Sequence, residues 1–197
     1  MEQQFQIIEK PDWVSWDEIS DIVYKAHESN RKKGVDIQNA HLSGEQLKES
    51  LGPDGVCFVA LDGDKVVATS SVAFHTLNTW FARGQKVGYG TLSAVLPEYK
   101  GLHLFSKLQQ MSVEYVKDKG CSSIYVKTAE GNTKMRSIAK KYGYFEVSIG
   151  RTLFNAHNYI TMYKWLDSRP FPVAYIRFRF FISWVMLKIK LMIGIVK

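Results

Sequence analysis

Hydrophobic and polar positions follow two different periods along the chain, and the changes of period mark the expected elements. Runs that alternate, or that are continuously apolar over a few residues, predict strands, whereas apolar residues three or four positions apart predict helices. The expected strands are residues 5–8, 56–61, 66–74, 87–96, 122–128, 145–149 and 153–165. The expected helices are residues 16–30, 44–51 and 102–119, with a short one ending at Tyr142.

Residues with strong end preferences support these boundaries. Ser15 and Ser43 each stand directly before an expected helix, where a serine side chain can accept from the first-turn amides. Gly63 lies between two strands and predicts a hairpin. The order of the elements is strand, two helices, three strands, helix, strand, helix and two strands. A mixed order of this kind predicts a three-layer α/β domain.

The chain of 197 residues suits one domain with an appendage, and we expect a domain over 1–168 and an extension over 169–197. The two cysteines, Cys57 and Cys121, are expected to be packed free thiols. The first residues lack the basic and apolar pattern of a signal peptide. Few cysteines and no such pattern favour a cytoplasmic location. No Cys/His cluster has metal-ligand spacing, so no metal is expected.

The positive charge is concentrated at one end. The formal net charge is +7, and residues 171–197 carry +5 of it without any acid, which leaves +2 for residues 1–170. A nearly balanced body argues against a broad nucleic-acid surface, so no nucleic-acid partner is expected. The question of an acidic partner therefore belongs to the C-terminal extension.

The most informative chemical pattern is the passage from the strand 87–96 into the helix 102–119. Pro97 and Gly101 lie in the short connection between them. A strand that turns through a glycine-containing loop into a helix presents unpaired N–H groups and the positive end of the helix dipole. This pattern predicts a site for a phosphorylated ligand.

The same stretch resembles the GCN5-related N-acetyltransferases (GNAT), in which V-x-P-x-x-[RQ]-x-x-G-x-[GA] joins the fourth strand to the third helix. The match begins at Val95 and places Lys100 at the Arg/Gln position, followed by the small residue Gly101. His103 stands where glycine is usual, and Phe105 stands at the Gly/Ala position. A second family signature, N-x-x-[AS]-x-x-x-[YF]-x-x-x-G-[FY], begins here at Asn132 and closes with Gly143-Tyr144. The resemblance covers residues 5–165.

This resemblance implies a mixed, mostly antiparallel sheet splayed between its fourth and fifth strands, with helices on both faces. It implies acetyl-CoA, or another acyl-CoA, as the co-substrate. Pantetheine would pair with the fourth strand, and the diphosphate would lie on the amides that open the helix. The cofactor-binding residues carried over are Ser93, Ala94, Val95, Lys100, Gly101, Leu102, His103, Leu104, Phe105 and Asn132.

The implied reaction is attack of a neutral amine on the thioester. The family often protonates the leaving thiolate from a tyrosine seven residues after the motif asparagine, and here that position is Ala139. Tyr142, three residues further on, is the candidate acid, with a core position as the alternative reading. His75, near the end of a strand, and Glu130, just after the fifth strand, are candidate bases. Each could equally be a surface residue.

Acceptor selectivity is expected from the first two helices and their connection. Asp36, Asn39 and His41 lie in that connection, and Trp80 offers a ring on which a sugar could stack. This polar set suits a hydroxyl-rich acceptor such as an amino sugar, although a plain solvated loop would have the same composition.

The extension is apolar and basic. On a helix, Arg179 and Lys190 share one stripe and Arg177 and Lys188 a second, and the rest is almost entirely apolar. Such a helix could pack on the domain, form a homodimer contact or lie peripherally on the inner face of an anionic membrane through residues 171–197.

The sequence thus favours an N-acyltransferase that moves an acetyl or other short acyl group to a primary amine of a small acceptor, such as an amino sugar of surface-polysaccharide synthesis. Two rivals are open. His103 and Ala139 favour a CoA-binding regulatory module of weak or no activity. An aminoacyl-tRNA-using transferase would need a more basic surface than the +2 of the body provides.

Overall fold

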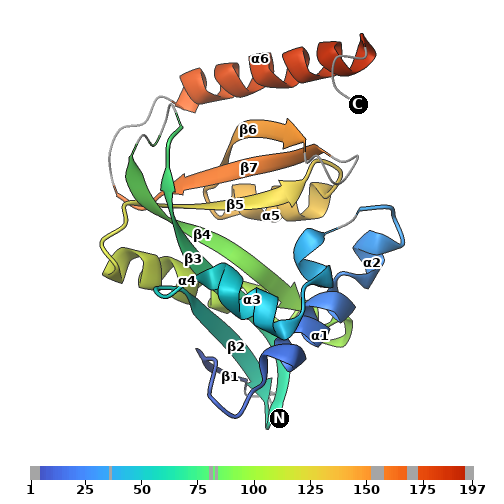
Figure 1. The fold of residues 1–197 in the computed structure, drawn as a ribbon, viewed down its shortest axis with the longest axis vertical. Helices are drawn as coiled ribbons and strands as arrows, with labels where there is room; N and C mark the ends of the chain where they lie inside the picture. The colour runs from blue at the N-terminus through green and yellow to red at the C-terminus, as the bar shows by residue number, and fades with distance from the viewer. Residues whose placement is uncertain are drawn as a thin grey trace.

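A computed structural model describes residues 5–35, 37–79, 82, 84–151, 158–167 and 173–193. Seven strands form one sheet in the order β1-β2-β3-β4-β5-β7-β6 (Figure 1). They are β1 (Gln6–Glu9), β2 (Val56–Asp62), β3 (Lys65–Leu77), β4 (Gln85–Val95), β5 (Ser123–Ala129), β6 (Phe145–Arg151) and β7 (Asn158–Trp165). Only the β4–β5 pair is parallel among these strands. The expected mixed, mostly antiparallel sheet is confirmed. The start of the last expected strand, residues 153–157, lies outside the described residues.

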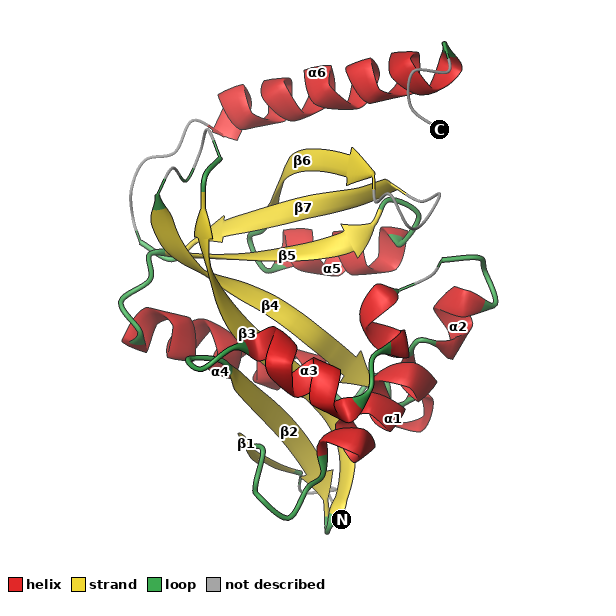
Figure 2. Cartoon of the chain, in the orientation of Figure 1, coloured by secondary structure: helices red, strands yellow, loops and turns green. Residues whose placement is uncertain are grey.

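Helices cover both faces of the sheet (Figure 2). Helices α1 and α3 pack on one face of the N-terminal half and α4 on the other, while α5 and α6 lie on opposite faces of the C-terminal half. The α-helices are α1 (Trp16–Ala26), α2 (Glu28–Arg31), α3 (Gly44–Leu51), α4 (Leu104–Asp118), α5 (Thr133–Lys141) and α6 (Val173–Met192). Two short 3₁₀ helices, η1 (Gln38–His41) and η2 (Pro97–Tyr99), connect them.

The helix starts follow the local sequence. The Ser15 side chain accepts from the Glu18 amide at 3.0 Å, and Ser43 forms a reciprocal capping box with Gln46. One boundary was wrong: the first helix ends at Ala26 and does not continue to residue 30. The chain turns at His27 before α2, so the apolar stripe of α1 stays on the sheet while the following residues lie elsewhere.

Strand β4 contains a bulge close to its end. The pairing with β3 runs from Ser71–Thr91 to Thr69–Ala94, so one residue of β3 opposes two residues of β4. Leu92, at the bulge, has a φ of +49°. A bulge of this kind bends the strand and increases its twist. The last residues of β4 are thereby turned away from the direction of β5.

Gly88 of β4 sets how closely α4 approaches the sheet. A Cβ at this position would lie 2.5 Å from Cγ2 of Val116 on α4. Val116 is fully buried, so its side chain can yield to an added methyl group only by disturbing its neighbours.

We expect Gly88→Ala to destabilise the protein by about 1–3 kcal/mol, because overpacking forces strain into the α4–sheet contact. Urea unfolding of this variant measures the loss. Val116→Ala in the same chain removes the clashing methyl groups and should recover part of it. The double variant should lose less stability than the sum of the two single losses, and strictly additive losses would contradict the close contact.

Candidate active site

The parallel pair β4–β5 is joined over a short length only. Its ladder contains three pairs, Gly88–Ile124, Tyr89–Tyr125 and Gly90–Val126. Beyond them β4 continues to Val95 and β5 to Ala129 without pairing to each other. Figure 1 shows the two strands starting together and diverging. The edge of β4 over residues 91–95 therefore offers backbone N–H and C=O groups to whatever enters the gap.

The start of α4 opens beside this gap. Gly101 has a φ of +93°, and an added Cβ would meet nothing within 4 Å. His103 caps the helix with a φ of +58° and makes no side-chain capping bond. The first intrahelical bond comes from the Lys107 amide to the His103 carbonyl at 3.2 Å. The preceding amides, at residues 104–106, are the unsatisfied donors of a helix N-terminus, which suits a phosphate group.

The strand gap and the helix start belong to one cavity of about 740 Å³. Its walls come from five places: the end of β4, the end of β5 with the turn after it, the entry of α4, helix α5, and the segment from α1 to η1. A volume of this size is typical of small-molecule sites.

The cavity carries positive charge. Its described lining contains five lysines and no aspartate or glutamate: Lys33, Lys100, Lys127, Lys134 and Lys141. The lysines of the α4 entry, α5 and β5 line the same cavity. Their positive charge adds to the positive potential at the N-terminal end of the α4 dipole. The site therefore favours anionic groups.

The sequence profile of the acetyltransferase (GNAT) family matches residues 16–144, which span everything from α1 to the end of α5. The chain belongs to the acetyltransferase (GNAT) family. A comparison with curated proteins finds no match. The family transfers acyl groups from acetyl-CoA to amines, and the sheet opening and helix entry described above are placed within the matched region.

Solved GNAT structures share the fold at low sequence identity. The ribosomal-protein-S18-alanine N-acetyltransferase from Escherichia coli aligns with a TM-score of 0.64 and 14% identity, over 86% of this chain and 98% of that one. Aminoglycoside 6'-acetyltransferase type Ii gives 0.62 and 18%, over 84% and 99%. A chain of the NatC complex bound to Gag peptide and CoA gives 0.63 and 12%, over 83% and 99%. These likenesses concern the fold alone.

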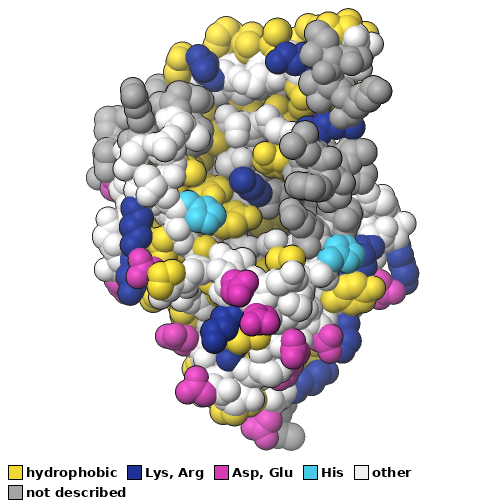
Figure 3. Space-filling model, viewed as in Figure 1, with side chains coloured by type: hydrophobic (Ala, Val, Ile, Leu, Met, Phe, Trp, Pro, Cys, Tyr) yellow, Lys and Arg dark blue, Asp and Glu magenta, His cyan; other side chains and the backbone are white. Residues whose placement is uncertain are grey.

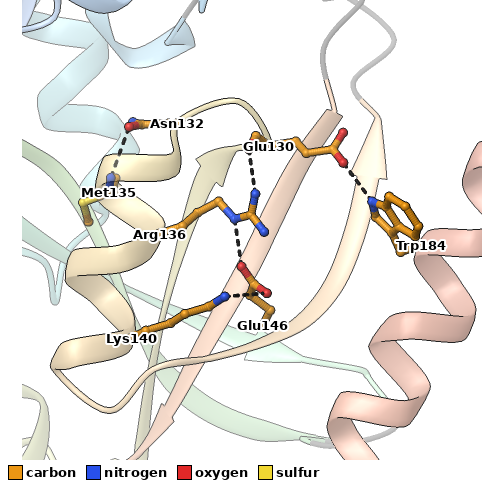
Figure 4. A network of polar contacts seen from close by, with 7 residues as sticks. All are labelled: Glu130, Asn132, Met135, Arg136, Lys140, Glu146 and Trp184. Atoms are coloured by element: carbon orange, nitrogen blue, oxygen red, sulfur yellow. Dashed lines mark hydrogen bonds and ion pairs between the residues drawn. The ribbon is translucent and has the colours of Figure 1, made fainter.

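Nine of the ten residues carried over from the GNAT motifs as cofactor-binding line the cavity. Leu102 is the exception, because its side chain is turned outward and is 41% exposed. The Asn132 side chain has a structural task as well, since its Oδ1 accepts from the Met135 amide at 3.2 Å and caps α5 (Figure 4). Their role in binding stays a prediction.

Tyr142 also lines this cavity of the GNAT domain. Its hydroxyl forms a hydrogen bond with the Ser106 hydroxyl in the first turn of α4, and its ring packs edge-on against Phe105, with centroids 6.2 Å apart. A hydroxyl held at the helix entry is placed to donate a proton within the cavity. The structure thus leaves Tyr142 as a candidate acid and gives it a defined position, although Ala139 replaces the usual tyrosine.

Glu130 lies elsewhere. It is absent from the described cavity lining, and its carboxylate accepts from Trp184 Nε1 at 2.9 Å (Figure 4). The carboxylate also accepts from Asn158 Nδ2 at 2.7 Å and from Lys188 Nζ at 3.3 Å. Burial raises its pKa, but these three donors outweigh burial and leave the pKa below its ordinary value. The expected base is therefore better described as an anchor for α6, because Trp184 and Lys188 belong to that helix.

His75 is likewise outside the described lining. Its Nδ1 lies 2.5 Å from the Tyr125 hydroxyl, and its ring stacks on Tyr89 with centroids 5.1 Å apart. Tyr89 itself lines the cavity, so His75 stands behind that ring. Burial and the charge of Lys127 lower the pKa of His75. A direct proton transfer from an acceptor to His75 has no support in this placement.

The residues expected to select the acceptor do not all lie at the cavity. Asn39 lines the cavity and donates from Nδ2 to Thr91 Oγ1 at 2.8 Å. His41 does not line it, because η1 turns its ring toward Tyr24, with centroids 6.2 Å apart. Asp36 and Trp80 lie outside the described residues.

His27 lines the cavity, although the sequence analysis did not single it out. The turn after α1 brings it against the backbone of Ser93. Burial, helped by Lys100 and Arg31, lowers its pKa to about 4, so the ring is neutral at pH 7. His27 directly follows Ala26, the last buried residue of α1, and this position was the sequence signal that could have identified it.

Proposed function

We propose that the chain transfers an acetyl group from acetyl-CoA to a primary amine of a small acceptor that also carries an anionic group, such as a phosphorylated or nucleotide-linked amino sugar. The observation that carries this proposal is that one cavity combines an open β4 edge, a helix start without a side-chain capping bond, and five lysines.

The residues present fit the co-substrate. Acetyl-CoA supplies an acyl thioester at the end of a pantetheine arm that contains amides. The open edge of β4 at Ser93–Val95 suits such an arm, because extended amides pair with an unpaired strand edge. The amides at the start of α4 and the side chain of Lys100 suit the diphosphate. Gly101 leaves the space that close approach of a phosphate needs.

The lysines also bear on how the acceptor loses its proton. A bound ammonium surrounded by positive charge and without a nearby carboxylate has a lowered pKa. An amine therefore reacts more readily in this cavity as the neutral nucleophile, and the amine proton can leave to water. This accounts for a site whose described lining contains no carboxylate, and in which burial lowers the pKa of His27, the histidine against Ser93.

The same charges select the acceptor. Three of the five lysines, at positions 100, 134 and 141, lie on the α4 entry and on α5. Lys127 on β5 and Lys33 after α2 stand on other walls. A simple cation such as a polyamine would be repelled by all of them, whereas a phosphate or carboxylate on the acceptor would be attracted.

Steady-state thioester cleavage with matched amines tests the proposal. We expect kcat/KM for glucosamine 6-phosphate to exceed that for glucosamine by about tenfold or more, equivalent to about 1.4 kcal/mol. Spermidine should be the poorest substrate. Lys127→Met should reduce the preference for the phosphorylated amine and leave the rate with glucosamine nearly unchanged. Equal rates with both sugars would contradict the anionic acceptor. Binding of CoA without turnover of any amine would favour the regulatory module.

A further inference from the structure

Helix α6 presents an apolar face to solvent. Of the twelve large hydrophobic residues that are exposed in the described part of the chain, nine lie in α6 or directly after it. They are Tyr175, Phe178, Phe181, Ile182, Trp184, Met186, Ile189, Met192 and Ile193. All but Trp184, which is bonded to Glu130, fall on the outward side of the helix. Soluble proteins normally scatter such residues, and a contiguous patch of them marks an interaction surface.

The inner side of the same helix packs against the domain. Ile176 is fully buried against Tyr125 and Tyr163, and Phe180 packs into the neighbouring core. Trp184 and Lys188 fasten the helix to Glu130. Because the inward face is fixed by these contacts, the outward face is the one left for a partner.

The charges of α6 border that outward face. At 100° per residue, Arg177 and Lys188 fall on one side of the exposed apolar stripe, and Arg179 and Lys190 fall on the other. The Lys188 ammonium is already paired with Glu130, at 3.3 Å. The helix contains four basic residues and no acid. Figure 3 shows hydrophobic side chains along the outer edge of the molecule at α6, with Lys or Arg side chains beside them.

We propose that α6 docks the protein on an anionic lipid surface, with its axis in the plane of the interface and its outer face among the headgroups. An apolar stripe bordered by basic residues is the arrangement that such helices use. Basic residues near anionic lipids each contribute about 1 kcal/mol. None of the helices in the described residues could span a bilayer.

A second copy of the chain is the less suitable occupant. Two α6 helices placed face to face would bring their basic borders together, and neither helix has an acid to offset the repulsion. A lipid surface with negative headgroups satisfies the apolar stripe and the charges at once.

The docked orientation has a consequence for the proposed transferase. Glu130, which holds Trp184 of α6, is followed directly by Gly131 and Asn132, which line the cavity (Figure 4). A surface-bound α6 would therefore hold one wall of the cavity close to the membrane, within reach of an acceptor carried on a lipid. This consequence depends on the proposed function, whereas lipid binding itself does not.

Co-sedimentation of the full chain with lipid vesicles tests the docking without any activity measurement. We expect the protein to pellet with phosphatidylcholine vesicles that contain phosphatidylglycerol, and to be released by high salt. Phe178→Ser with Phe181→Ser should lower the partition coefficient by about tenfold or more, because two exposed rings no longer leave water. Arg177→Glu with Lys190→Glu should lower it by about tenfold or more on the anionic vesicles alone.

Trp13→Ser is the matched control, since Trp13 is 58% exposed but belongs to the turn before α1 and not to α6. This variant should partition like the unchanged chain. Circular dichroism should be unchanged in all variants, because every substituted side chain is exposed. Equal pelleting of the Phe178→Ser, Phe181→Ser variant and the unchanged chain would overturn the proposal. A stable dimer in lipid-free solution that the same two substitutions dissociate would also overturn it.

Discussion

Replacement of Gly101 by glutamate is expected to raise the dissociation constant for CoA by at least about 100-fold, or about 2.7 kcal/mol. Two effects combine. A φ of +93° is strained for any residue with a side chain. The carboxylate would also stand beside the diphosphate, where two like charges about 4 Å apart repel by several kcal/mol at protein surfaces. Isothermal titration calorimetry with CoA measures the change.

Gly120→Glu separates the binding effect from the backbone strain. Gly120 also has a positive φ, +74°, with nothing within 4 Å of an added Cβ, but it lies beyond the opposite end of α4 and does not line the cavity. It adds the same charge and the same strain to the same helix. We expect this variant to bind CoA like the unchanged chain. Parallel losses of affinity in both variants would show that the α4 entry is not the diphosphate site.

The second large effect is expected from Tyr142→Phe. If the Tyr142 hydroxyl protonates the leaving thiolate, its removal should lower kcat by about 100-fold. The ring contact with Phe105 is kept, so KM for acetyl-CoA should change by less than about threefold. Steady-state kinetics with the best amine of the panel provides the measurement.

Two further variants test whether the loss of kcat comes from the Tyr142 hydroxyl itself. Ser106→Ala removes the hydrogen-bond partner of Tyr142 but leaves the phenol in place, so its effect on kcat should be smaller. Tyr115→Phe makes the same chemical change at a partly buried tyrosine of α4 that does not line the cavity and whose hydroxyl donates to the Asp54 carbonyl, so it should not change kcat. An unchanged kcat in Tyr142→Phe would mean that water, or another group, protonates the thiolate.

The sequence predicted the main elements because their signals are local. The strand 87–96, the glycine-containing turn and the helix after it are adjacent in the chain, so their junction could be recognised without the fold. The capping serines Ser15 and Ser43 act within three residues and were equally visible.

What the sequence could not predict depends on contacts between distant segments. Glu130 was expected near an acceptor, but its partners, Asn158, Trp184 and Lys188, arrive from β7 and α6. The convergence of Lys33, Lys127 and Lys134 on one cavity has the same origin, since three separate elements bring them together.

The break of the first helix after Ala26 was missed for a different reason. Helical periodicity continues weakly through residues 28–31, and the structure uses those residues for a separate short helix. The turn at His27 is what brings that ring against Ser93. Helical periodicity predicts the apolar stripe of α1 but does not predict where the chain changes direction.

The most direct test of the central claim is a crystal structure of the protein with acetyl-CoA. The account predicts pantetheine amides paired with the β4 backbone at Ser93–Val95, and the diphosphate on the amides from Gly101 to Ser106. A bound acetyl-CoA that leaves the gap between β4 and β5 unfilled, or whose diphosphate lies away from the start of α4, would contradict it.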